Sequence, residues 1–158
     1  MDERTETQQA LEANKAVSHR LMNEVWGQGK VEVLDEIMSE DVVDHGAVDS
    51  SGGRNAIKEA VLMIRAAFPD FHAVEVDFIA EGDKVVRRWT IAGTHEGDFL
   101  GLPPTGRKVR VTGINVDRIV DGRIVEYWHN FDLLGWLEQL GVSVPIELAS
   151  SSSFAGQD

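Results

Sequence analysis

Two polar residues on the last two predicted strands, Asn115 and His129, could together move a proton next to a carbonyl group. An imidazole can take up or release a proton near neutral pH, so His129 is a candidate general base or acid. The Asn115 amide can donate a hydrogen bond to the oxygen of a developing enolate. The alternative is that the two residues hydrogen-bond each other and only line a binding cavity.

Whether these residues share one face of a sheet depends on the hairpin around the Asp-Gly pair at 121–122. If the loop contains only this pair, Asp117 lies directly opposite Glu126, and like charges in that position destabilise a strand pair. A loop over 120–122, with Gly122 left-handed beside a bulge, instead places oppositely charged side chains diagonal to each other, so that they attract. We therefore predict the three-residue loop.

In this register Asn115 lies opposite Tyr127 and on the same face as His129. The face is otherwise apolar, as in most sites for small molecules. It contains Val111, Gly113, Asn115, Val125, Tyr127, His129 and Phe131. Apolar residues also occupy the outer face, which would be unusual on a monomer and predicts a homodimer through this surface. These outer residues are Ile114, Val116, Ile124 and Trp128.

Asp44 and His45 follow each other on a short predicted strand over residues 41–46. Neighbouring side chains on a strand point to opposite faces, so at most one of them can enter a pocket. We favour His45 as a third candidate for acid–base chemistry. Together with Asp41 and Asp49 the pair could also form a metal site, but no recognised ligand spacing supports this, and we expect no metal.

Two further candidates for the substrate pocket, His95 and Asp132, also have a structural interpretation. His95 ends a long predicted strand, where it could reach the pocket mouth or hold the following loop by hydrogen bonds. Asp132 could supply a carboxylate close to His129, but it also directly precedes an apolar helical pattern over 133–140. Because aspartate is a preferred residue before the first helical turn, we favour capping for Asp132.

These residues are positioned by a predicted α+β fold in which helices come first and strands follow. Helical spacing of apolar residues is found over 10–26, 31–38, 57–68 and 133–140. Alternation and turn signals predict strands over 41–46, 72–80, 84–96, 107–120 and 123–131. This order of helices and strands along the chain favours a fold in which helices cover one face of a largely antiparallel sheet. The walls of an apolar cavity are expected to include Trp26, Trp89, Tyr127 and Phe131.

The composition is that of one globular domain, with 42% hydrophobic and 27% charged residues among 158. The formal charge of −12 would repel a nucleic-acid backbone, and the absence of cysteine excludes disulfides and thiolate metal sites. No signal peptide or membrane span is recognisable, so we expect a cytoplasmic protein. We predict a flexible N-terminus over 1–9, one domain over 10–142, and a C-terminal extension over 143–158 with a mobile Ser-rich tail.

A series of motifs runs in order through most of the chain. It comprises Phe-Pro-Asp at 68–70, Gly-Thr-His-Glu-Gly at 93–97, Gly-Leu-Pro-Pro-Thr-Gly-Arg at 101–107, Arg-Ile-Val-Asp-Gly-Arg-Ile at 118–124 and Gln-Leu-Gly at 139–141. From about Ala13 to Gly141, the chain therefore resembles the SnoaL-like polyketide cyclases and the broader ester cyclase group.

This resemblance implies a cone-shaped fold like that of nuclear transport factor 2 and ketosteroid isomerase, with a pocket between the helices and the concave sheet. It also implies ring closure of an aromatic polyketide by intramolecular aldol condensation, without metal or cofactor. The family's catalytic aspartate corresponds to His129, and its assisting histidine to Asn115, so both positions depart from the family pattern. In ketosteroid isomerase a catalytic carboxylate lies on the strand that here carries Asp44 and His45.

Three functions remain open at this point. The first is a cofactor-free cyclase or isomerase acting on a small apolar carbonyl compound, with His129 as base and Asn115 as oxyanion donor. The second is a module that binds a small apolar molecule without chemistry, and the third is a structural dimer. A buried His129 beside Asn115 in an open pocket would favour the first two, and a filled pocket the third.

Overall fold

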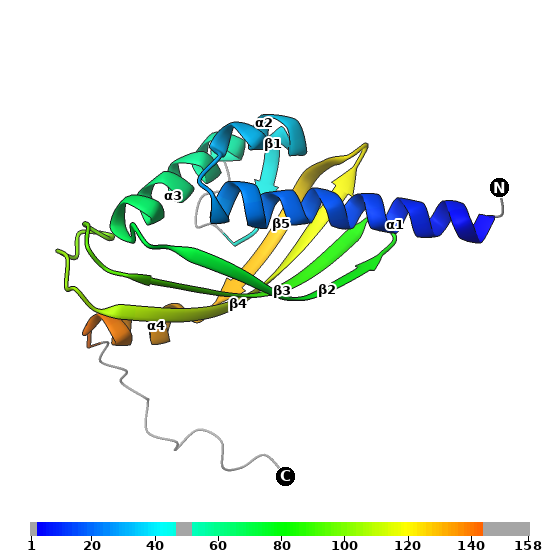
Figure 1. The fold of residues 1–158 in the computed structure, drawn as a ribbon. Helices are drawn as coiled ribbons and strands as arrows, with labels where there is room; N and C mark the ends of the chain where they lie inside the picture. The colour runs from blue at the N-terminus through cyan, green and yellow to red at the C-terminus, as the bar shows by residue number, and fades with distance from the viewer. Residues whose placement is uncertain (1–2, 47–51, 144–158) are drawn as a thin grey trace, which may run out of the picture.

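A curved five-stranded sheet forms one layer of the computed structural model, which describes residues 3–46 and 52–143. The strands are β1 (Met38–Asp44), β2 (His72–Glu81), β3 (Lys84–Thr94), β4 (Lys108–Val120) and β5 (Arg123–Phe131). Their order in the sheet is β1-β5-β4-β3-β2 (Figure 1). Pairing is antiparallel from β2 to β5, whereas β1 runs parallel to β5. The predicted α+β class with a mostly antiparallel sheet is confirmed.

Helices α1 to α3 cover one face of this sheet (Figure 1). In chain order, the helical elements are α1 (Glu3–Arg20), a π-helical segment (Leu21–Gly27), a 3₁₀ turn (Val31–Val33), α2 (Leu34–Ile37), α3 (Gly53–Ala67) and α4 (Leu133–Leu140). α1 begins at Glu3, so residues expected to form a flexible N-terminus are helical from there onward. Its first turns extend past the sheet, which is why no apolar periodicity marks them. The expected Ser-rich tail lies outside the described residues.

The buried side chains form two clusters, and the half-buried Trp26 packs against both of them. One cluster joins the helical layer to β1 and β5 through residues such as Leu21, Leu34 and Ile124. The other lies towards α4 and contains Phe68, Phe99, Val111, Trp136 and Leu140. Residues of both clusters, among them Met22 and Tyr127, also line the cavity between the helices and the sheet.

The β4–β5 hairpin has neither of the two registers considered from the sequence. Its loop contains only Asp121 and Gly122, both left-handed with φ of 50° and 74°, as a tight hairpin turn requires. The register then shifts, so that Ile119 lies opposite Ile124 but Arg118 lies opposite Glu126. The bulge in β5 therefore removes the Asp117–Glu126 clash, and Arg118 Nε donates to Glu126 Oε2 over 3.2 Å.

The predicted three-residue loop is wrong, but its main consequence is confirmed. Because the bulge adds one residue to β5, Asn115 and His129 lie directly opposite each other and on the same face. Asn115 therefore does not face Tyr127, which lies opposite Asp117. Ile124 precedes the bulge and is fully buried, which corrects its assignment to the outer face.

Apolar side chains are exposed on the opposite face of the sheet. They include Val74, Val76, Ile79 and Ile114. A register shift between Glu75 and Asp77 turns Val74 and Val76 outward, away from the side that Phe78 and Ala80 share with the core. A homodimer through this face stays a prediction, and light scattering at micromolar concentration would test it. Within the described residues, no helix combines the length and hydropathy needed to cross a membrane.

Candidate active site

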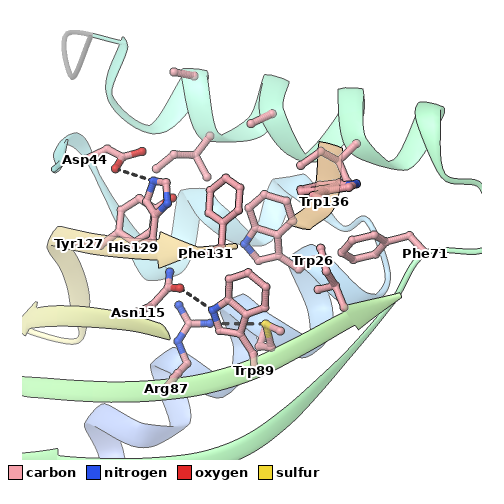
Figure 2. Close-up of a pocket in the computed structure, with 16 residues that line it drawn as sticks. Trp26, Asp44, Phe71, Arg87, Trp89, Asn115, Tyr127, His129, Phe131 and Trp136 are labelled. Atoms are coloured by element: carbon pink, nitrogen blue, oxygen red, sulfur yellow. Dashed lines mark hydrogen bonds and ion pairs between the residues drawn. The ribbon is translucent and has the colours of Figure 1, made fainter. Parts of the chain in front are cut away.

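A cavity of about 320 Å³ lies between α3, the π-helical segment and the inner face of the sheet. Its aromatic walls are Trp26, Phe71, Trp89, Phe131 and Trp136, shown in Figure 2. α3 contributes Ala56 and Ala60, whose short side chains leave space in front of the sheet. Among the described residues, the polar lining consists of Asp44, Arg87, Asn115, Tyr127 and His129. An unfilled, mostly apolar cavity with a few convergent polar groups suits a small organic ligand.

His129 projects from β5 toward Asp44 at the end of β1, and its Nε2 lies 3.1 Å from Asp44 Oδ1 (Figure 2). Both side chains are largely buried, with 19% and 15% exposed. The backbone N–H of Gly46 donates to the same Asp44 oxygen over 2.9 Å and fixes the carboxylate. A carboxylate accepts only, so Nε2 carries the proton and Nδ1 is left as the proton acceptor of the neutral ring.

Gly46 also provides the space that His129 occupies. A Cβ atom at this position would collide with the imidazole, beginning with Nε2. The glycine thus has a steric role at the pair in addition to its hydrogen bond to Asp44.

Tyr127 adds a hydroxyl to the same end of the cavity. Burial raises the pKa of its phenol, and the negative charge of Asp44 and a hydrogen bond with Asp44 raise it further. Tyr127 therefore stays protonated at neutral pH and supports the carboxylate as a donor. Its ring stacks on His129 with 5.1 Å between centroids, and Phe131 lies 5.9 Å from the other side. The imidazole is thus held between aromatic neighbours.

Asn115 is 7% exposed, and its Oδ1 accepts a hydrogen bond of 2.5 Å from Trp89 Nε1. Because an indole nitrogen can only donate, this bond fixes the orientation of the Asn115 amide and leaves its NH₂ group available as a donor. Trp89 can lie across β4 because residue 113 is glycine, where a Cβ would collide with the indole ring. Gly113 and Trp89 therefore position Asn115.

Arg87 on β3 reaches the cavity from the other side of Asn115, its direct neighbour across the strands. Its Nε and Nη2 donate to the carboxylate oxygens of Asp117 over 2.9 and 3.0 Å. Asp117 also accepts a hydrogen bond from Ser18 on α1. Arg87 and Asp117 are both at most 1% exposed, so this is a fully buried pair with a fixed geometry.

The predicted pocket walls Trp26, Trp89, Tyr127 and Phe131 all line the cavity, as do Asn115 and His129. His45 does not, and its predicted inward orientation is wrong. It lies on the outer side, where its ring stacks on Trp128 at 4.5 Å and its Nε2 is 3.9 Å from Glu126. The strand instead turns Asp44 inward, the residue that the sequence interpretation had placed second.

His95 is fully buried but lies outside the cavity lining, which corrects its place among the pocket residues. Its Nδ1 accepts hydrogen bonds from the backbone N–H of Thr105, over 3.2 Å, and makes a contact of 3.0 Å with the Thr105 hydroxyl. Its ring stacks on Phe68 with 5.2 Å between centroids. Of the two interpretations considered, the structure favours the one in which His95 holds the following loop.

Asp132 precedes α4 and accepts a hydrogen bond of 2.8 Å from the backbone N–H of Gly135. The capping prediction is confirmed, and the alternative of a carboxylate in the substrate pocket is wrong. Asp132 borders a separate open depression, which also involves Val76 and Ile114.

Arg87 and Trp136 are pocket residues that the sequence interpretation missed. Arg87 is two residues from Val85 on β3 and shares its inner face, so the period of two residues along the strand could have identified it. Trp136 comes from α4, and no pattern within the chain shows where that short helix docks. Among the described residues, no cluster of histidine and acidic side chains is suited to hold a metal ion.

Comparison with known proteins places this chain in a family. The model described as SnoaL-like polyketide cyclase matches residues 16–140. Aklanonic acid methyl ester cyclase DnrD of Streptomyces peucetius is 31% identical over 130 residues, which cover 80% of this chain and 90% of that protein. Nogalonic acid methyl ester cyclase of Streptomyces nogalater is 28% identical over 123 residues, with coverages of 76% and 92%.

The solved structure of wild-type IdmH from Streptomyces antibioticus superposes with a TM-score of 0.69 and 35% identity. The match covers 82% of this chain and 99% of that one. Sequence and fold thus agree over the part of the molecule that encloses the cavity. The chain belongs to the family of SnoaL-like polyketide cyclases.

Proposed function

We propose that this protein closes a ring in an aromatic polyketide methyl ester by a cofactor-free intramolecular aldol reaction. The observation that carries the proposal is the His129–Asp44 pair, with 3.1 Å between Nε2 and Oδ1, at the polar end of an otherwise apolar cavity. The names of the methyl ester cyclases among the relatives support this substrate class.

In the first step, Nδ1 of His129 takes a proton from a carbon next to a carbonyl group of the substrate. The electron pair of the broken C–H bond passes to the carbonyl oxygen and gives an enolate. The NH₂ group of Asn115 donates to this oxygen, and Asp44 stabilises the imidazolium through Nε2–H.

In the second step, the enolate carbon attacks a second carbonyl carbon of the same molecule and forms the new C–C bond. The electron pair of that carbonyl moves to its oxygen, and the resulting alkoxide takes the proton back from His129. The enzyme returns to its starting state, and the product is an isomer of the substrate. The aromatic walls of the cavity hold the polyketide substrate in a folded conformation. They also exclude water, which would otherwise protonate the enolate.

The second candidate is a module that binds the same class of molecule without converting it. It is favoured by the residues at the two family positions, where His129 and Asn115 stand in place of an aspartate and a histidine. The two functions differ in turnover and not in affinity.

Incubation with aklanonic acid methyl ester and with nogalonic acid methyl ester tests the proposal. We expect a product of unchanged mass and altered retention in liquid chromatography–mass spectrometry. The His129→Ala variant should bind the ester and give no product above the uncatalysed rate. Tight binding to the wild-type protein without any isomer formed would instead establish the binding module.

A further inference from the structure

Three polar residues cross the floor of the cavity in one line. Arg87 on β3 lies directly opposite Asn115 on β4, which in turn lies directly opposite His129 on β5. Opposed Cα atoms on antiparallel strands are about 4.5 to 5.5 Å apart, so Arg87 and His129 are separated by roughly 10 Å at the backbone. Figure 2 shows Asn115 between His129 above it and Arg87 below it.

One nitrogen of the Arg87 guanidinium has no oxygen acceptor among the described residues. Nε and Nη2 donate to Asp117, but Nη1 donates to the thioether sulfur of Met22, at 3.6 Å (Figure 2). A thioether is a weak acceptor, whereas a guanidinium nitrogen buried at 1% exposure favours an oxygen. Because Asp117 already balances the charge of Arg87, this nitrogen suits a neutral or delocalised oxygen better than a separate full negative charge.

We propose that Arg87 is a specificity-determining residue that binds a second oxygen of the substrate, a carbonyl or hydroxyl group on the ring system remote from the reacting carbon. That oxygen displaces the Met22 sulfur from Nη1. The three residues then set the orientation of the substrate in the cavity. Its acidic carbon lies at His129, its carbonyl oxygen at Asn115 and its remote oxygen at Arg87. The inference rests on the proposed function for the class of substrate, but it concerns binding and is measured without turnover.

Two probes that differ in one oxygen test the proposal. Methyl 6-hydroxy-2-naphthoate carries an oxygen at each end of a flat ring system, and methyl 2-naphthoate lacks the remote hydroxyl. Quenching of tryptophan fluorescence reports binding, because Trp26, Trp89 and Trp136 line the cavity. A hydrogen bond to a charged group corresponds to a preference of about tenfold to a hundredfold for the hydroxylated probe in the wild-type protein.

The Arg87→Lys variant keeps a cation beside Asp117 but removes the third guanidinium nitrogen, and it should lose this preference. The Met22→Leu variant leaves Arg87 intact and removes the competing sulfur, so it should increase the preference. If Arg87→Lys does not fold, Met22→Leu decides alone. A merely structural Arg87 predicts equal preferences in all three proteins.

Equal affinity of the wild-type protein for the two probes, or no binding of either, would overturn the proposal. So would an unchanged preference in the folded Arg87→Lys protein or in Met22→Leu. The His129→Ala variant should retain the preference. Loss of the proposed function would therefore appear as normal turnover in His129→Ala, and loss of this inference as an absent probe preference.

Discussion

Two histidine–carboxylate pairs in the described part of the chain are within hydrogen-bond distance, and only one of them lines the cavity. His19 Nδ1 is 2.5 Å from Glu75 Oε2, which is a shorter contact than the 3.1 Å between His129 and Asp44. Yet His19 is half exposed and stacks on Phe78, at a centroid distance of 4.3 Å. Contact geometry alone therefore does not distinguish a reactive pair.

The difference between the pairs lies in their surroundings. Asp44 is oriented by the Gly46 backbone and supported by Tyr127, and its partner His129 faces an apolar cavity next to the Asn115 amide. Glu75 has one carboxylate oxygen that is buried and has no hydrogen-bond partner within the described part of the chain. The first pair faces the cavity, and the second connects α1 to β2.

Replacement of His129 by alanine should give the largest effect. Loss of a positioned general base corresponds to a decrease of about 10²–10⁴-fold in turnover. The matched variant His19→Ala removes the other histidine and should leave turnover of the methyl ester unchanged. Steady-state rates for both variants, with circular dichroism as a check on folding, would make the comparison. A similar loss in both variants would remove the distinction between the pairs.

Addition of a methyl group at Gly46 should give the second-largest effect on turnover. The Gly46→Ala substitution pushes the imidazole of His129 out of position without removing it, and small misplacement of a catalytic group can cost about 10²-fold. Because Gly46 is exposed at a turn, the unfolding midpoint should change little. Turnover equal to that of the wild-type protein would show that the position of the His129 ring does not matter.

The Asp44→Asn substitution should lower kcat by about tenfold to a hundredfold, since it removes the charge that stabilises the imidazolium, while KM changes little. Glu75→Gln is the matched control and should leave both constants unchanged. An effect of Asp44→Asn on KM alone would assign Asp44 to substrate binding and not to support of His129.

The smallest expected effect is on the free energy of unfolding and involves Glu75 of the His19–Glu75 pair. Burial raises the pKa of the Glu75 carboxyl above its ordinary value, against the opposing influence of His19 and Arg87. A raised pKa means that the folded state binds this proton more tightly than the unfolded chain does. The stabilisation is present below about pH 4.5 and is lost as the pH rises through the raised value. We therefore expect the free energy of unfolding, measured with urea, to decline less with rising pH in Glu75→Gln than in the wild-type protein over this pH interval. A larger decline would contradict the direction of the shift.

The sequence was sufficient to place Asn115 and His129 together, although the argument used the wrong loop. Strand alternation has a period of two residues, so a loop and a bulge that together change the register by two residues preserve the face. Capping by Asp132 was predictable as well, because it depends only on the few residues that follow it.

The choice between Asp44 and His45 was not predictable in the same way. Which of two neighbouring strand residues points inward depends on pairing with a distant strand, here Asp44 with Tyr127 on β5. The role of Arg87 is equally remote from local pattern. Its burial depends on Asp117 and on Ser18 of α1, far away in the chain.

Exchange of hydrogen for deuterium at the acidic carbon tests the central claim most directly. The substrate would be an analogue of the methyl ester without the second carbonyl group, so that its enolate forms but cannot close a ring. In D₂O, proton NMR should show exchange catalysed by the wild-type protein and by His19→Ala at equal rates. The rate should fall by about 10²–10⁴-fold in His129→Ala. Equal exchange with wild-type protein and His129→Ala would contradict the assignment of His129 as the base.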